Sequence, residues 1–174
     1  MMFHCDQRDE PDPGKGLIAG VAGGLIASLV MEQFQAAWSF IAKKLQDPKQ
    51  RNSSEAAKPT TVKAADAIAR RVVGHKMRKK HQKLAGEAMH YAMGVGSAAV
   101  YGMLAEVAPV VTAGEGTAFG AVVWLAADEA SLPALGLTKP PNRIPISTHV
   151  YALASHLVYG AVTEAVRRAL RKAL

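Results

Sequence analysis

A run of 27 residues from Gly16 to Ala42 constrains what this chain can fold into more than any other feature. Within this run, the one Asp, Glu, His, Lys or Arg is Glu32. A helix rises about 1.5 Å per residue, so a helix of this length can cross a hydrocarbon core of about 30 Å. The sequence therefore predicts a transmembrane helix over residues 16–42.

Small residues recur at every fourth position of this predicted helix, at Gly16, Gly20, Gly24 and Ser28. Residues four apart share a helix face, and a face without large side chains lets a second backbone approach closely. Glu32 is the next residue on the same face. We therefore expect another helix to pack against this face.

The positive charge of the chain is concentrated in one segment. Residues 43–83 contain 13 Lys or Arg against 3 Asp or Glu, a net charge of +10, whereas the whole chain carries +7. The remainder is apolar and rich in Gly and Ala, although the mean hydropathy is only +0.06. This segregation is typical of a multi-pass membrane protein with one basic loop, here 43–83.

Three further apolar segments follow the basic loop. Residues 88–105 contain one Asp, Glu, His, Lys or Arg, His90, and residues 144–163 contain no formally charged side chain. Only 12 uncharged residues separate Glu115 from Asp128, so the segment between them is the weakest of the three. The sequence predicts an all-α protein: a disordered tail over 1–14 without a cleavable signal, then one transmembrane domain over 15–174 with helices at 16–42, 84–108, 112–131 and 146–165.

Part of the basic loop has its own helical pattern. Apolar residues recur at three- and four-residue steps from Val62 to Met77, and basic residues fill the other face. Such an amphipathic helix can rest on anionic lipid headgroups over residues 60–83, or it can be a solvated helix packed on a partner. Nucleic acid is a poor partner, because no aromatic residue interleaves the charges and no recognition motif is present.

An internal repeat links the helices. Val100-Tyr101-Gly102-x-x-x-Glu106 recurs as Val158-Tyr159-Gly160-x-x-x-Glu164, and the small-residue face that begins at Gly20 is echoed from Gly116. A duplicated helix pair explains both similarities, and chance resemblance among Gly-rich helices is the alternative. The glycines that we expect at helix contacts are Gly16, Gly20, Gly24, Gly94, Gly102, Gly116, Gly120 and Gly160.

Ionisable residues inside the bilayer cost a few kcal/mol each on insertion scales, about 3 for a carboxylate at the centre, so each needs a partner or a function. The positive-inside rule places both loops that carry Lys or Arg in the cytoplasm and both termini on the far side. The basic residues after Glu164, which we interpret as a basic stop, argue against this orientation. The intramembrane polar residues are Glu32, Glu87, His90, Glu106, Asp128, His156 and Glu164, with Glu115, Glu129 and His149 near the ends of the predicted helices.

Three interpretations of these polar residues remain open. They can hydrogen-bond one another across helix interfaces as neutral groups, or form a proton or ion path along Glu32, Asp128, His156 and Glu164. Glu87-x-x-His90 also matches half of a di-iron motif, but a second Glu-x-x-His is missing, so we expect no metal and no other cofactor. No arrangement of nucleophile, base and acid is present, and we expect no enzyme.

Several segments together resemble the YagU-like family of bacterial inner-membrane proteins, whose biochemical function is not established. They are the opening GLIAGVAGGLIASLVMEQFQ, Tyr101-Gly102-x-x-x-Glu106-x-x-Pro109, Gly116-x-x-x-Gly120 with Asp128 and Glu129, and His156-x-x-Tyr159-Gly160-x-x-x-Glu164. The resemblance leaves out the tail and the basic loop. It implies four helices, a bacterial inner-membrane location and an association with acid tolerance, and it carries over no catalytic residue.

The sequence thus predicts a non-enzymatic integral membrane protein, a scaffold or accessory subunit that packs through its glycine-lined faces on a second copy of itself or on a larger membrane complex. The alternative is a protein that conducts protons or small ions through its intramembrane carboxylates and histidines.

Overall fold

The computed structural model describes residues 10–45, 60–73 and 79–174. Within these ranges the regular structure is entirely helical, which confirms the all-α prediction. The long helices are α1 (Pro13–Leu45), α3 (Thr60–Val73), α4 (Lys79–Val107) and α7 (Ile146–Ala173). Shorter elements are the 3-10 helices η1 (Pro109–Thr112) and η3 (Pro141–Arg143), α5 (Thr117–Trp124), the π-helix η2 (Leu125–Ser131) and α6 (Leu132–Ala134).

Helix α1 begins at Pro13, three residues before the predicted start at residue 16, because Asp12 caps it. The Asp12 Oδ1 atom accepts hydrogen bonds from the backbone N–H groups of Gly14 (2.9 Å) and Lys15 (3.0 Å), and proline is favoured at the first helical position. The N–H of Lys15 holds the pKa of the Asp12 carboxyl below its usual value. Residues 10–14 of the predicted tail are therefore described and ordered around this cap, while residues 1–9 lie outside the described part.

By length and composition alone, α1 is the one described helix that could cross a membrane, and 39% of its most apolar window is buried within the molecule. A signal sequence, or a core helix of a protein in water, meets the same criterion. Helices α4 and α7 are long enough, but their charged and other polar side chains make them less apolar. One candidate span is therefore shown, and the other three predicted spans remain a proposal.

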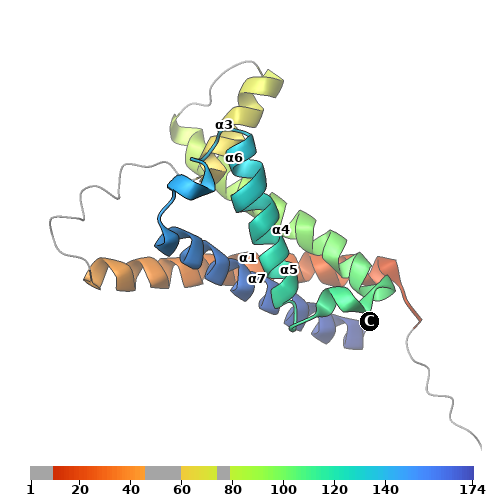
Figure 1. Cartoon of the computed structure of the whole chain (residues 1–174). Coiled ribbons are helices and arrows are strands. Elements are labelled where there is room, and N and C mark those ends of the chain that lie inside the picture. The colour runs from red at the N-terminus through yellow and green to blue at the C-terminus, as the bar shows by residue number, and fades with distance from the viewer. Residues whose placement is uncertain (1–9, 46–59, 74–78) are drawn as a thin grey trace, which may run out of the picture.

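The four predicted membrane helices pack in the spatial order α4, α1, α7, α5. Helix α1 contacts both α4 and α7, and α5 contacts α7. The N-terminus of α1, the end of α4 and the C-terminus of the chain lie together at one end of the molecule (Figure 1). The N-terminal part of α4 lies far from this end, where α3 packs on it.

Two matching glycine contacts hold the helix pairs together. A Cβ added to Gly102 of α4 would overlap the carbonyl oxygen of Gly16 in α1. In the same way, a Cβ added to Gly160 of α7 would overlap the carbonyl oxygen of Gly116, at the start of α5. The pairs α1–α4 and α5–α7 therefore share one contact geometry, which supports the duplicated helix pair. The structural equivalence relates Gly16 to Gly116, one helical turn away from the Gly20–Gly116 match that the sequence suggested.

The third predicted helix differs most from the structure. We predicted a continuous helix over 112–131, but α5 starts only at Thr117, because three successive residues have positive φ: Gly114 (+62°), Glu115 (+55°) and Gly116 (+83°). Left-handed residues end a helical turn, and only glycine adopts them without strain. After Trp124 the chain widens into the π-helix η2 without a break.

One face of helix α3 is buried against α4. Val62 and Ala65 are buried, and a Cβ added to Gly86 of α4 would lie 2.5 Å from the Val62 Cγ2 atom. Of the two alternatives for the basic amphipathic helix, these contacts favour a helix packed on a protein neighbour, which is α4 itself. Lys63 remains exposed on the other face.

We predict that Gly102→Ala destabilises the protein, whereas Gly96→Ala in the same helix does not. The added methyl at residue 102 would meet the α1 backbone, and overpacking of this kind costs about 1–3 kcal/mol. No atom lies within 4 Å of the corresponding position at Gly96, where alanine should be neutral or stabilising by up to about 1 kcal/mol. Thermal unfolding of both variants in mild detergent measures the difference, and equal melting temperatures would contradict the glycine contact.

Candidate functional site

A cavity of about 930 Å³ lies among the helices α1, α4, α5, η2 and α7. Helices α1 and α7 contribute Ser28, Met31, Ala152 and Tyr159 to its lining, α4 contributes one wall, and α5 with η2 contributes the opposite wall. Thr61 and Val62 of α3 also border it. Its volume is that of a site for a drug-sized molecule, and most of the lining is apolar.

The cavity gathers most of the ionisable residues that the sequence singled out. Five of the seven predicted intramembrane polar residues line it, and the other two, Glu106 and Glu164, lie at the opposite end of the molecule. The acidic and histidine residues of the lining are Glu32, Glu87, His90, Asp128, Glu129, His149 and His156. Of the predicted glycines, Gly94 also borders the cavity, whereas Gly16, Gly20, Gly24, Gly102, Gly116, Gly120 and Gly160 lie in the helix contacts.

The π-helix η2 carries two of these acids, Asp128 and Glu129. A π-turn inserts one extra residue per turn and leaves carbonyl groups without their usual helical donor, and such turns are frequent at functional sites. Here the Ser131 hydroxyl donates to the carbonyl oxygen of Ala126 at 2.6 Å.

Two of the carboxylates already have hydrogen-bond partners. The Tyr91 hydroxyl donates to Glu32 Oε2 at 3.0 Å. Glu129 Oε1 lies 2.5 Å from His149 Nδ1, and His149 Nε2 lies 3.1 Å from the carbonyl oxygen of Pro141. Because a carbonyl oxygen can only accept, Nε2 carries a proton, and the Nδ1–Oε1 contact requires a further proton shared between imidazole and carboxyl.

Asp128, in contrast, has its nearby histidine beyond hydrogen-bond distance. His156 Nδ1 lies 2.9 Å from the Ala152 carbonyl oxygen, so this nitrogen carries a proton that it donates within its own helix. Asp128 Oδ2 lies 3.9 Å from the same nitrogen, beyond hydrogen-bond distance. The Asp128 side chain is only 30% exposed. It is therefore a partly buried carboxyl group with unused acceptor capacity.

Three further polar atoms in the lining lack a partner within the part of the chain that the structure describes. They are Ser28 Oγ, His90 Nε2 and Thr138 Oγ1, each buried. Buried polar groups are normally satisfied, so these three atoms are exceptions to the usual hydrogen-bonded state of a helix interface. Among the described residues, no group of three or more His, Cys, Asp or Glu is arranged to hold a metal ion.

The opposite end of the molecule neutralises its acids internally. Glu164 is fully buried, and it accepts hydrogen bonds from the Tyr101 hydroxyl at 2.7 Å and from Arg167 Nε at 2.7 Å. Arg168 Nε donates to its other oxygen at 2.5 Å and also pairs with Glu115. The Glu164 carboxylate raises the pKa of Arg167. This carboxylate is held in a closed network.

Glu106 belongs to the same ion-pair cluster. Arg171 donates to both of its carboxylate oxygens, each at 2.8 Å, and Arg167 Nη1 lies 3.3 Å from Oε1. We interpreted the arginines after Glu164 as a basic stop, which misses this role. Their spacing of three and four residues from Glu164 places Arg167 and Arg168 beside it on one helix face, and this spacing is the signal that could have revealed the pairing.

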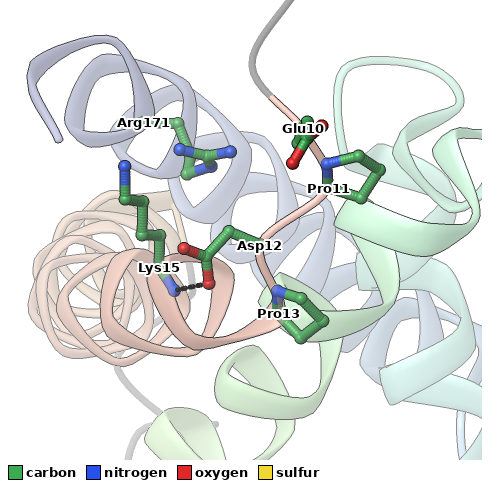
Figure 2. A pocket seen from close by; sticks show the side chains of 6 residues that line it. All are labelled: Glu10, Pro11, Asp12, Pro13, Lys15 and Arg171. Atoms are coloured by element: carbon green, nitrogen blue, oxygen red, sulfur yellow. Dashed lines mark hydrogen bonds between the residues drawn. The ribbon is translucent and has the colours of Figure 1, made fainter.

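A smaller crevice of about 340 Å³ lies beside this cluster, at the start of α1 (Figure 2). It is lined by Glu10, Pro11, Asp12, Pro13, Lys15 and Arg171. The Lys15 ammonium donates to the backbone carbonyl oxygen of Leu174 at 2.9 Å, and the Asp12 N–H donates to Glu106 at 3.4 Å. The beginning and the end of the described chain are thus tied together over the ion-pair cluster.

The fold and the cavity define an all-α protein with one candidate membrane-spanning helix and a mostly apolar cavity that is bordered by carboxyl and imidazole groups. The chain belongs to the family described as protein of unknown function (DUF1440), whose family model matches residues 48–165. The match covers α3 to most of α7, including the basic segment that the YagU-like resemblance left out, and it excludes α1. It carries neither the YagU name nor a source organism. No curated protein and no solved structure matches the chain.

We predict that Glu164→Gln strongly destabilises the protein, because it leaves the buried Arg167 guanidinium without its main counter-charge. Breaking one partner of a buried ion pair costs about 3–5 kcal/mol. Glu115→Gln is the control, since the Glu115 side chain is 75% exposed and exposed pairs contribute little. Thermal denaturation in detergent should show a large drop for Glu164→Gln alone, and a similar small change in both variants would refute the closed network.

Proposed function

We propose that this protein is a non-enzymatic, multi-pass membrane protein that holds a ligand in the cavity between α4 and α5, as a binding or accessory subunit. The observation that supports this function best is the cavity of about 930 Å³ itself, whose mostly apolar lining also carries four carboxyl groups and three histidines. A bundle stabilised by packing alone would fill such a space with apolar side chains, whereas ionisable groups placed beside it in an apolar surrounding cost free energy unless something binds them.

Exposed apolar side chains support four membrane spans. On α1, Ile18 is 59% exposed, and on α4, Val100 is 51% exposed. Leu125 of η2, which continues α5, is 57% exposed, and Val150 of α7 is 52% exposed. Large apolar side chains on the outer surface of every helix of the bundle are what lipid contact requires. With the YagU-like resemblance, we infer a bacterial inner-membrane location.

The basic segment gives the proposed orientation. With residues 43–83 in the cytoplasm, the exposed Lys63 and Lys83 can approach anionic lipid headgroups, and both termini lie on the far side. Arg167 and Arg171, whose position argued against this orientation, are largely enclosed by ion pairs, since their side chains are only 10% and 11% exposed.

The scaffold hypothesis has less support than the sequence suggested. Its motivation was a surplus of glycine-lined faces, but Gly16, Gly20 and Gly102 are used between α1 and α4, and Gly116, Gly120 and Gly160 between α5 and α7. A homo-oligomer or a larger complex would therefore have to form through the larger apolar side chains of the outer surface, such as Leu25 and Ile26 on α1.

The proton-path hypothesis also has less support. Such a path would need Glu164 to exchange protons with Asp128 and His156, but Glu164 is fully buried and bound by two arginines and Tyr101. The Asp128–His156 pair lies in the cavity, and within the described part of the chain no hydrogen bond or ion pair joins it to that network. A binding site at the cavity end alone accounts for the closed Glu164 network and for the separate Asp128–His156 pair.

We predict that a membrane-impermeant maleimide labels Cys5, the single cysteine, in intact bacterial cells. The proposed orientation places the N-terminal tail outside the cytoplasm. A Cys5→Ser, Ser53→Cys variant is the control, because residue 53 lies in the basic loop and should react only after the cells are permeabilised. The reverse pattern would invert the orientation, and labelling of both cysteines in intact cells would argue against a membrane-enclosed loop.

We predict that native mass spectrometry from mild detergent detects a non-covalent ligand on the protein, and that Ala152→Trp removes it. Ala152 lines the cavity, so an indole at this position fills the space of the ligand. Ala165→Trp on the exposed side of the same helix is the matched control and should retain the ligand. If the wild-type protein carries no bound mass, or Ala152→Trp retains it, the proposed function is wrong.

A further inference from the structure

We propose that the ligand of this cavity is a lipophilic organic cation and that the carboxylate of Asp128 is its counter-ion. The proposal rests on the proposed function, because it names the chemical class of the molecule that the cavity holds. It follows from the charges of the lining, from the partners that each carboxylate has or lacks, and from the apolar and aromatic walls.

The charge of the cavity favours a cation. Four carboxyl groups line it, and among its described residues Lys83 is the one Lys or Arg. Glu129 and His149 share a proton and are neutral as a pair, so with the other histidines neutral the three remaining acids against one base give a net charge of −2. Lys83 is 90% exposed and lies 3.8 Å from Glu87, so its charge is directed to the outside of the cavity. Low-dielectric walls strengthen the attraction between such a negative site and a cation, and they repel an anion.

Asp128 is the carboxylate that remains for a ligand. Glu129 is engaged by His149, Glu32 accepts from Tyr91, and Glu87 is 48% exposed beside Lys83. Asp128 is less exposed than Glu87, and it lies 3.9 Å from His156 Nδ1, a nitrogen that already donates elsewhere. A partly buried carboxylate without a hydrogen-bond donor loses part of its hydration as an anion, and a bound cation compensates that loss.

The remaining walls suit the organic part of such a ligand. Apolar side chains including Met31, Met93, Val122 and Leu132 line the cavity. Tyr91, Tyr151 and Tyr159 add aromatic rings, whose faces attract cations. A small hydrated metal ion would leave these walls unused, and no three metal-binding side chains meet among the described residues. The site fits a cation that spreads its charge over an apolar body.

The test compares two probes of the same shape and opposite charge, tetraphenylphosphonium and tetraphenylborate. Binding to the full-length protein in nanodiscs is measured by equilibrium dialysis against empty nanodiscs, which corrects for uptake by lipid. We expect saturable binding of the phosphonium and none of the borate. Asp128→Asn should weaken phosphonium binding at least about tenfold, because it removes the counter-charge with little change in volume. Asp128→Glu should retain the preference for the cation.

Glu10→Gln is the matched control, because it removes one carboxylate from the opposite end of the molecule and should leave phosphonium binding unchanged. The melting temperature of each variant identifies any that fails to fold. If Asp128→Asn does not fold, the preference of the wild-type protein and of Asp128→Glu for the phosphonium over the borate tests the proposal instead. Absence of phosphonium binding, equal binding of both probes, or unchanged binding to folded Asp128→Asn overturns the proposal. A ligand that native mass spectrometry detects and Ala152→Trp removes would, in that case, leave the proposed function standing with a ligand of another class.

Discussion

The structure depends on backbone-to-backbone contact at glycine. Where Gly102 meets Gly16, and where Gly160 meets Gly116, the two helices approach so closely that no Cβ fits between them. Close approach at one point fixes how far apart the helices are elsewhere, because straight helices that touch at one end must diverge if they cross at an angle. Figure 1 shows α4 leaving α1 toward α3 in this way. The cavity is the space that this divergence opens, so the glycine contacts determine its position although, of the glycines that we predicted at helix contacts, only Gly94 borders it.

The two ends of the bundle treat their acids in opposite ways. At the closed end, Glu106 and Glu164 receive hydrogen bonds from arginines and from Tyr101, which compensates the cost of burying them. In the cavity, Asp128 receives no hydrogen bond of comparable geometry. A protein stabilised only by helix packing would gain from pairing or removing such a carboxyl group. The contrast distinguishes acids that hold the fold together from an acid that is available to bind something else.

The helices and their glycine contacts could largely be predicted from the sequence, because both depend on the spacing of residues within one helix. Four-residue spacing places Gly16, Gly20 and Gly24 on one face whatever the tertiary structure, so their contact with another helix followed directly. The π-helix at Leu125–Ser131 could not be predicted, since no residue pattern distinguishes it from an α-helix there. The cavity could not be predicted either, because it depends on which helices do not touch. The arginines after Glu164 were misinterpreted because a basic cluster after an apolar helix is also the usual pattern of a membrane boundary.

The internal repeat shows how a site can arise on a symmetric frame. With Gly16 equivalent to Gly116 and Gly102 to Gly160, Ser28 is equivalent to Asp128, and Ala98 to His156. The first pair of helices thus has small residues where the second has the carboxyl and imidazole groups that lie 3.9 Å apart in the cavity. Glu106 and Glu164 are equivalent too, but α4 ends before Pro109, so α7 supplies the arginines for both. The shared residues build the contacts, and the residues that differ between the halves build the charged groups of the site.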